Sequence, residues 1–138
     1  KMCEAMIKDS NLGNCEILRL ENKHAFKGTY YTLKELNHPA FILGSDCLFD
    51  FPKWQHYEEL VRDNYFIVFS REKNIKKMME FIKTEKVLSK YKNNFMFINL
   101  NMRQISSTTF RQKLDKKMLS DSVFSYIAEH NLYEVKND

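Results

Sequence analysis

Three short apolar segments recur along this chain, and they constrain its fold more than any other feature. They read AFILG (40–44), YFIVFS (65–70) and NFMFINL (94–100). Apolar runs of about four to eight residues bounded by polar loops are typical of strands buried on both faces, which occur mainly in parallel sheets. Segments with helical spacing of apolar residues separate the runs. This alternation predicts an α/β fold, a parallel sheet with helices on both faces.

The other elements are predicted from cap residues and from the spacing of apolar residues. In chain order they are a helix at the start, a strand over 15–22, a helix capped by Thr29, a helix over 50–63 that is entered through a turn and carries Trp54 on its apolar face, an amphipathic helix or a broken pair over 73–91, and helices from about Ser107 and over 121–130. With only 3 Gly and 2 Pro, the chain is expected to be dense in regular structure.

The length and composition predict one soluble domain over residues 1–138, since a chain of this length can fold around a single hydrophobic core. No apolar run approaches the roughly 18 residues that a membrane-spanning helix needs. Cys3, Cys15 and Cys47 stand far apart without a C-x-x-C pair, which predicts free thiols, a cytoplasmic location and no structural zinc site. The net charge of +4 favours an anionic partner only weakly.

The segment ISSTTFRQKL (105–114) places hydroxyl groups at the start of a predicted helix. Free backbone N–H groups and the positive end of the helix dipole favour a phosphate there. Arg111 follows Ser107 and Thr108 by three or four residues, so its guanidinium lies on the same side of the first turns. Ordinary capping by Ser106 or Ser107, with Arg111 in solvent, explains the segment equally well, and both interpretations stay open.

Two further candidate sites follow the first apolar run. In FILGSDCLFDFP, Gly44 allows a ligand to approach the backbone and Asp46 offers a carboxylate to hydroxyl groups, although a turn capped by Asp46 is the simpler interpretation. Trp54, the single tryptophan, can stack on a flat heterocycle, although a partly buried Trp more often belongs to the core.

Ligands of open α/β sheets bind beyond the carboxyl ends of the strands. Residues 44–46, 70–71 and 105–108 all follow such ends, so we expect them to converge on one edge. The four histidines show no metal-ligand spacing, and His56 and His130 are interpreted as packing or surface residues. No P-loop or G-x-G-x-x-G motif occurs.

Taken together, five segments resemble the bacterial nicotinate-nucleotide adenylyltransferases in order and spacing. They read GTYYTLKEL, GSDCLFDFPKWQHYEEL, YFIVFSRE, ISSTTFRQKL and VFSYIAEHNLYE. The resemblance covers nearly the whole chain. It implies a Rossmann-like nucleotidyltransferase fold and transfer of AMP from ATP to nicotinate mononucleotide, giving deamido-NAD and pyrophosphate in NAD biosynthesis.

The resemblance also implies roles for the candidate residues. It assigns catalysis to Ser107, Thr108 and Arg111, which would bind the ATP phosphates and neutralise charge that grows toward pyrophosphate. The residues that it assigns to substrate binding are Thr29, Tyr30, Gly44, Asp46, Trp54, Arg71 and Ser106.

Within the substrate-binding set, Trp54 would stack on the pyridine ring. Thr29 and Tyr30 would recognise the nicotinate carboxylate, next to Gly28, which stands where the family usually has a tyrosine. The nucleotide cleft would be lined by Gly44 and Asp46, and Arg71 would reach a phosphate. Mg²⁺ would arrive bound to the phosphates of ATP, so no dedicated metal ligands are expected from the protein.

The segment G-G-T/S-F-D-P-x-H-x-G-H of that family, with its first strand and two catalytic histidines, is absent from these residues. We therefore interpret the chain as the carboxyl-terminal two thirds of such a domain, without the first βαβ portion, and expect this part alone to be inactive.

Three alternatives remain. One is a non-catalytic descendant that keeps nucleotide binding or serves as an interaction module. Another is a sister adenylyltransferase that uses nicotinamide mononucleotide. An RNA-binding module is disfavoured, because the aromatic residues follow buried-strand patterns, and neither nucleic acid nor membrane is an expected partner. The sequence gives no indication of the oligomeric state.

Overall fold

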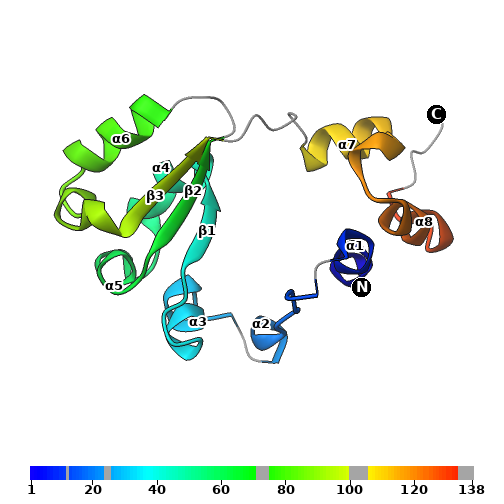
Figure 1. Ribbon diagram of the computed structural model, residues 1–138, viewed down its shortest axis with the longest axis horizontal. Helices are drawn as coiled ribbons and strands as arrows, with labels where there is room; N and C mark the ends of the chain where they lie inside the picture. The colour runs from blue at the N-terminus through cyan, green and yellow to red at the C-terminus, as the bar shows by residue number, and fades with distance from the viewer. Residues whose placement is uncertain (12, 24–25, 71–74, 100–105, 134–138) are drawn as a thin grey trace. The chain divides into compact units, whose positions relative to one another are not determined.

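The computed structural model describes residues 1–11, 13–23, 26–70, 75–99 and 106–133 (Figure 1). The contacts within the chain divide it into two compact units. One unit is Leu20–Met102, and the other combines Lys1–Arg19 with Arg103–Asp138. We describe each unit by itself, and the single domain over 1–138 stays a prediction.

The unit Leu20–Met102 is built on a parallel three-stranded sheet in the order β1-β2-β3 (Figure 1). The strands are β1 (Phe41–Gly44), β2 (Phe66–Ser70) and β3 (Phe95–Asn99). Phe66 of β2 pairs with Phe41 on one side and with Phe95 on the other. The three apolar runs are therefore parallel strands, as the sequence predicts.

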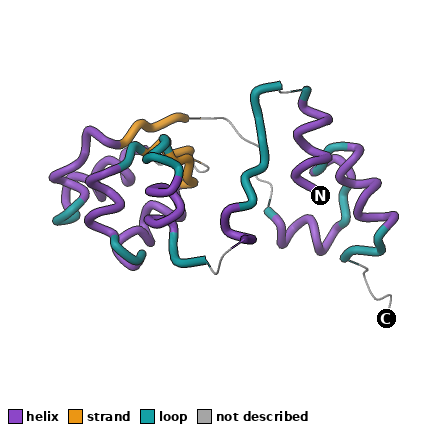
Figure 2. The backbone as a smooth tube through the Cα atoms, turned by 90° about the horizontal axis from the view of Figure 1, so that it is seen from below, coloured by secondary structure: helices purple, strands orange, loops and turns teal. Residues whose placement is uncertain are grey.

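The helices of this unit precede β1 in the chain or connect its strands (purple in Figure 2, with the strands in orange). They are α2 (Leu20–Lys23), α3 (Thr29–Glu35), α4 (Ser45–Asp50), the 3₁₀ helix η1 (Phe51–Lys53), α5 (Tyr57–Asp63), α6 (Ile75–Thr84) and the 3₁₀ helix η2 (Leu88–Asn94). Fully buried side chains from β2 and from five of these helical segments form one core: Leu48, Phe51, Leu60, Val61, Phe66, Val68, Met78 and Leu88.

The second face of the sheet is more open than the apolar runs predict. Ile42 on β1 is 60% exposed and Met96 on β3 is 61% exposed. These residues alternate with Leu43 and Phe97, which belong to the core side. Within the described part of this unit, the prediction of strands buried on both faces is therefore wrong for β1 and β3.

Three element predictions need correction. Residues 15–19 have no regular structure and α2 begins at Leu20, so the strand over 15–22 is absent. Alternating polarity alone does not make a strand, because its backbone also needs a partner. Thr29 is the first residue of α3 and not its cap, since Gly28 occupies that position.

The predicted helix over 50–63 is divided. Pro52 lies in the first turn of η1, and Trp54 is extended, with φ −79° and ψ 149°, before α5 begins at Tyr57. Trp54 is thus in a short connection and not on a helix face. The broken pair over 73–91 is correct, since α6 and η2 are separate.

The connection between α6 and η2 is fixed by one carboxylate. Oε2 of Glu85 accepts hydrogen bonds from the Tyr57 hydroxyl and from the backbone N–H groups of Val87 (2.8 Å) and Leu88 (2.7 Å). Burial opposes ionisation of Glu85, but these hydrogen bonds outweigh it, so its pKa is lowered from the ordinary value. Burial and the bond to Glu85 raise the pKa of Tyr57.

The other unit is helical in its described residues. It contains α1 (Met2–Ser10), α7 (Ser107–Lys113), the 3₁₀ helix η3 (Lys116–Met118) and α8 (Asp121–Glu129), as the sequence predicts for α1, α7 and α8. Its core is formed by Phe110, Val123 and Ile127. Asp9 joins α1 to α8, because its carboxylate accepts the Ser122 N–H (3.0 Å) and hydroxyl (2.5 Å), which lower its pKa.

We expect Glu85→Gln to destabilise the unit Leu20–Met102 by about 1–2 kcal/mol at pH 7, because three donors lose a charged acceptor. Glu80→Gln, an exposed change on α6, is the matched control. Because the folded pKa of Glu85 is lowered, its contribution is complete above its ordinary pKa and is lost as the pH falls through the folded value. Urea unfolding followed by Trp54 fluorescence should therefore show a difference between wild type and Glu85→Gln that shrinks in acid. A difference that is absent at pH 7, or that grows in acid, would contradict this account.

Candidate functional site

A cavity of about 660 Å³ lies in the unit Leu20–Met102. One wall is the approach to α3 together with its first turn, and the other is the connection between η1 and α5. The lining residues are Phe26, Lys27, Gly28, Thr29, Tyr31, Trp54, Gln55 and His56. Thr29 and Trp54, two residues predicted to bind substrate, are therefore brought together.

The α3 wall depends on the backbone of Gly28. Its φ of 116° and ψ of 155° lie in a region that side-chain-bearing residues rarely adopt. Its carbonyl accepts the N–H groups of Tyr31 (3.1 Å) and Thr32 (3.4 Å), which starts the helix. A Cβ at Gly28 would lie 3.1 Å from Oε1 of Gln55, so the glycine also allows the two walls to approach each other.

The opposite wall carries Trp54 on the core. The backbone N–H of Trp54 donates to the Phe51 carbonyl (2.9 Å). The centroids of the two rings are 4.8 Å apart, and the angle between the ring planes is 48°. Phe51 is fully buried, whereas Trp54 is half-buried and lines the cavity. The two interpretations of Trp54, as a core residue and as a cavity residue, are therefore compatible.

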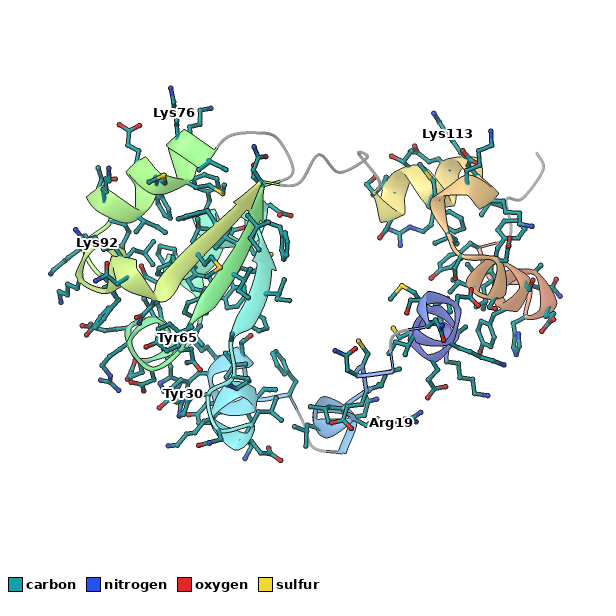
Figure 3. The ribbon with its side chains drawn as sticks, in the orientation of Figure 1. Arg19, Tyr30, Tyr65, Lys76, Lys92 and Lys113 are labelled. Atoms are coloured by element: carbon teal, nitrogen blue, oxygen red, sulfur yellow. The ribbon has the colours of Figure 1, made fainter. Side chains whose placement is uncertain are left out.

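Tyr30 and His56 lie beside each other at this site. Tyr30 is on α3 (Figure 3), and its ring centroid is 5.1 Å from that of His56. The His56 Nε2 and the Tyr31 hydroxyl are 2.8 Å apart in a hydrogen bond. The sequence interpretation placed His56 among packing or surface residues and did not single out Tyr31 or Gln55. Only their nearness to Thr29 and Trp54 along the chain could have suggested them.

Gly44 and Asp46 do not line this cavity. Gly44 ends β1 with an ordinary extended backbone (φ −81°, ψ 160°), and α4 begins at the next residue, so the predicted loop is a direct strand-to-helix junction. Asp46 is exposed in the first turn of α4. The ends of β1 and β2 share one edge of the sheet, where Gly44 pairs with Phe69. Arg71 lies outside the described residues.

The ISST segment belongs to the other unit. Ser106 caps α7, since its hydroxyl accepts the Thr109 N–H at 3.0 Å, which agrees with the capping interpretation. Ser107, Thr108 and Arg111 are exposed, and their side chains make no hydrogen bond or ion pair within the described part of the chain. Ser106, Ser107 and Arg111 line one hollow of about 190 Å³, whose other lining residues are apolar or aromatic, and Thr108 does not line it.

Across the described ranges there is no group of three or more His, Cys, Asp or Glu side chains arranged to bind a metal ion. None of the helices in those ranges has both the length and the apolar character required to cross a bilayer. The cysteines at positions 3, 15 and 47 are free thiols, as predicted.

The family model described as cytidylyltransferase-like matches residues 1–113, which run from α1 to the end of α7. This chain belongs to the cytidylyltransferase-like family. Among the curated relatives that it resembles is a probable nicotinate-nucleotide adenylyltransferase of Clostridium botulinum, 32% identical over an alignment of 123 residues that covers 78% of this chain and 61% of the relative. The same-named protein of Thermosipho melanesiensis is 28% identical over 107 residues, 78% of this chain and 51% of that protein. This cytidylyltransferase-like chain thus spans about half to three fifths of the length of these relatives.

The chain is also similar to solved structures. The Plasmodium falciparum nicotinic acid mononucleotide adenylyltransferase complexed with APC has a TM-score of 0.64 and 26% identity, over 92% of this chain and 71% of that one. The complex with NaAD gives a TM-score of 0.55 and 28% identity, over 78% and 58% of the two chains. These matches confirm the predicted Rossmann-like nucleotidyltransferase fold of this cytidylyltransferase-like chain and the resemblance seen in its motifs.

We expect Gly28→Ala to destabilise the unit by about 1 kcal/mol or more, because alanine is strained at positive φ and its Cβ would displace the Gln55 side chain. Gly13→Ala is the matched control, since an added Cβ there meets no atom within 4 Å. Thermal unfolding should show a lower midpoint for Gly28→Ala alone. Equal midpoints for both variants would contradict the backbone assigned to Gly28.

Proposed function

We propose that this chain is part of an enzyme that transfers AMP from ATP to nicotinate mononucleotide, giving deamido-NAD and pyrophosphate. The observation that carries the proposal is the cavity in which Thr29 and Trp54 face each other. Support also comes from relatives that are named nicotinate-nucleotide adenylyltransferases and from solved neighbours with APC and NaAD. Because the chain spans only part of those relatives, the activity is proposed for the whole protein.

The cavity suits the pyridine end of the nucleotide. The exposed part of the Trp54 indole offers a flat apolar surface for a heterocycle. Backbone N–H groups at the start of α3, next to Thr29, are the donors that we assign to the nicotinate carboxylate. Lys27 adds a cation to the same lining, which favours a negatively charged substituent over a neutral amide.

The phosphate chemistry is assigned to the ISST segment. In the reaction, a phosphate oxygen of nicotinate mononucleotide forms a bond to the α-phosphorus of ATP as the bond from that phosphorus to pyrophosphate breaks. Catalysis then consists of positioning and charge stabilisation. We assign donors for the ATP phosphates to the hydroxyls of Ser107 and Thr108 and to the Arg111 guanidinium, which are exposed and without partners in the described residues.

The remaining assignments are kept as proposals. Five further residues stay predicted substrate contacts: Ser106, Tyr30, Gly44, Asp46 and Arg71. Mg²⁺ bound to ATP would neutralise phosphate charge. We also propose a cytoplasmic location, with which the free thiols are compatible.

We expect nicotinate mononucleotide to quench the fluorescence of Trp54 saturably, because the pyridine ring stacks on the only tryptophan of the chain. Nicotinamide mononucleotide should bind at least about tenfold more weakly, since it lacks the charge that a cationic lining attracts. Trp54→Phe supplies the blank, and AMP controls for quenching by any nucleotide. Equal binding of acid and amide would favour the sister enzyme that uses nicotinamide mononucleotide, and quenching by AMP alone would contradict the ring site.

A further inference from the structure

The two walls of the cavity are joined by one side-chain hydrogen bond. The Tyr31 hydroxyl and the His56 Nε2 are 2.8 Å apart, with the rings edge to face at a centroid distance of 5.0 Å and an angle of 86°. Tyr31 lies in the first turn of α3, and His56 is the residue before α5. The bond therefore links two segments that are 25 residues apart in the chain.

Each partner of this bond is close in sequence to a proposed contact with the pyridine nucleotide. Thr29 precedes Tyr31 by two residues, and Trp54 precedes His56 by two residues. Each partner of the bond is therefore separated by a single residue from a residue that lines the cavity. The Tyr30 ring also packs on the His56 ring, with a centroid distance of 5.1 Å and an angle of 33° between the ring planes.

His56 is held in an unusual backbone conformation. Its φ of 53° and ψ of 36° are left-handed, a region that few residues other than glycine adopt and in which asparagine, aspartate and histidine are enriched. Its carbonyl accepts the Leu60 N–H at 2.7 Å, and the Glu59 carboxylate lies 3.8 Å from Nδ1. The hydrogen bond to Leu60 holds the backbone of His56 at the start of α5, and the ring lies between Glu59 on its Nδ1 side and Tyr31 on its Nε2 side.

The exposure of the pair indicates that it contributes to the site more than to folding. Tyr31 is 41% exposed, and the His56 side chain is 39% exposed. Water competes for a hydrogen bond at such a position, so its loss changes global stability little. A looser cavity, however, must be ordered at each binding event, and that lowers the apparent affinity for the ligand.

We propose that the Tyr31–His56 hydrogen bond is a latch that positions Thr29 against Trp54, with Tyr31 and His56 as positioning residues for the pyridine nucleotide. The identity of the ligand rests on the proposed function, whereas the latch itself does not.

The first test compares Tyr31→Phe with Tyr65→Phe in the 138-residue chain. Both variants remove one hydroxyl, and Tyr65 is 65% exposed with no hydrogen bond from its hydroxyl in the described residues. Without ligand, acrylamide should quench Trp54, excited at 295 nm, more strongly in Tyr31→Phe than in wild type. The dissociation constant for nicotinate mononucleotide should rise about fivefold, with the urea midpoint nearly unchanged. Tyr65→Phe should match wild type in all three measurements.

The second test is a double-mutant cycle with His56→Asn, since asparagine tolerates the left-handed backbone but does not reproduce the imidazole contact. If the latch acts as a unit, Tyr31→Phe/His56→Asn binds no more weakly than the weaker single variant. Additive losses would overturn the proposal, as would an unchanged dissociation constant in Tyr31→Phe.

The two claims fail in different ways. If wild type binds neither pyridine nucleotide, the proposed function fails, and acrylamide quenching alone decides the latch. If wild type binds and Tyr31→Phe matches it in affinity and in quenching, the latch is wrong and the proposed function stands.

Discussion

The pairing of β2 with a parallel strand on each side is the constraint on which the unit Leu20–Met102 depends. It stacks Phe66 on Phe95, with centroids 5.0 Å apart, and Phe51 of η1 packs edge to face on Phe66 at 5.1 Å. Trp54 then packs on Phe51. One continuous set of aromatic contacts therefore leads from the central strand to the wall of the cavity, and the core that stabilises the sheet also fixes the proposed ring-binding surface.

The rest of the cavity depends on the backbone conformations of two of its lining residues, Gly28 and His56. Gly28 supplies a conformation that starts α3 and leaves room for Gln55, and His56 supplies a left-handed residue that starts α5. Both helices thus begin at a residue with positive φ that also lines the cavity. The free N–H groups at the start of a helix suit the binding of a carboxylate.

Much of this arrangement follows from the sequence, because the signals concerned are local. Continuous apolar runs locate β1, β2 and β3, and the serines of the ISST segment locate the start of α7. Ser106 caps that helix, in agreement with the capping interpretation of the segment. The strand predicted over 15–22 fails because pairing is a tertiary property that alternation does not encode.

The partners across the cavity are harder to predict. Tyr31 and His56 meet only because β1 and β2 bring α3 and α5 together, and no spacing within either segment signals that contact. The roles of Ser107, Thr108 and Arg111 rest on motif resemblance, since they belong to the other unit and are described separately from the cavity.

The most direct test of the central claim is a ¹H–¹⁵N NMR titration of the 138-residue chain with nicotinate mononucleotide. The account predicts that saturable shifts concentrate on the backbone N–H groups of Thr29 and Gln55 and on the indole N–H of Trp54. Shifts confined to residues outside the cavity lining, or a folded chain whose spectrum does not change at all, would contradict the assignment of this cavity as the pyridine-nucleotide site.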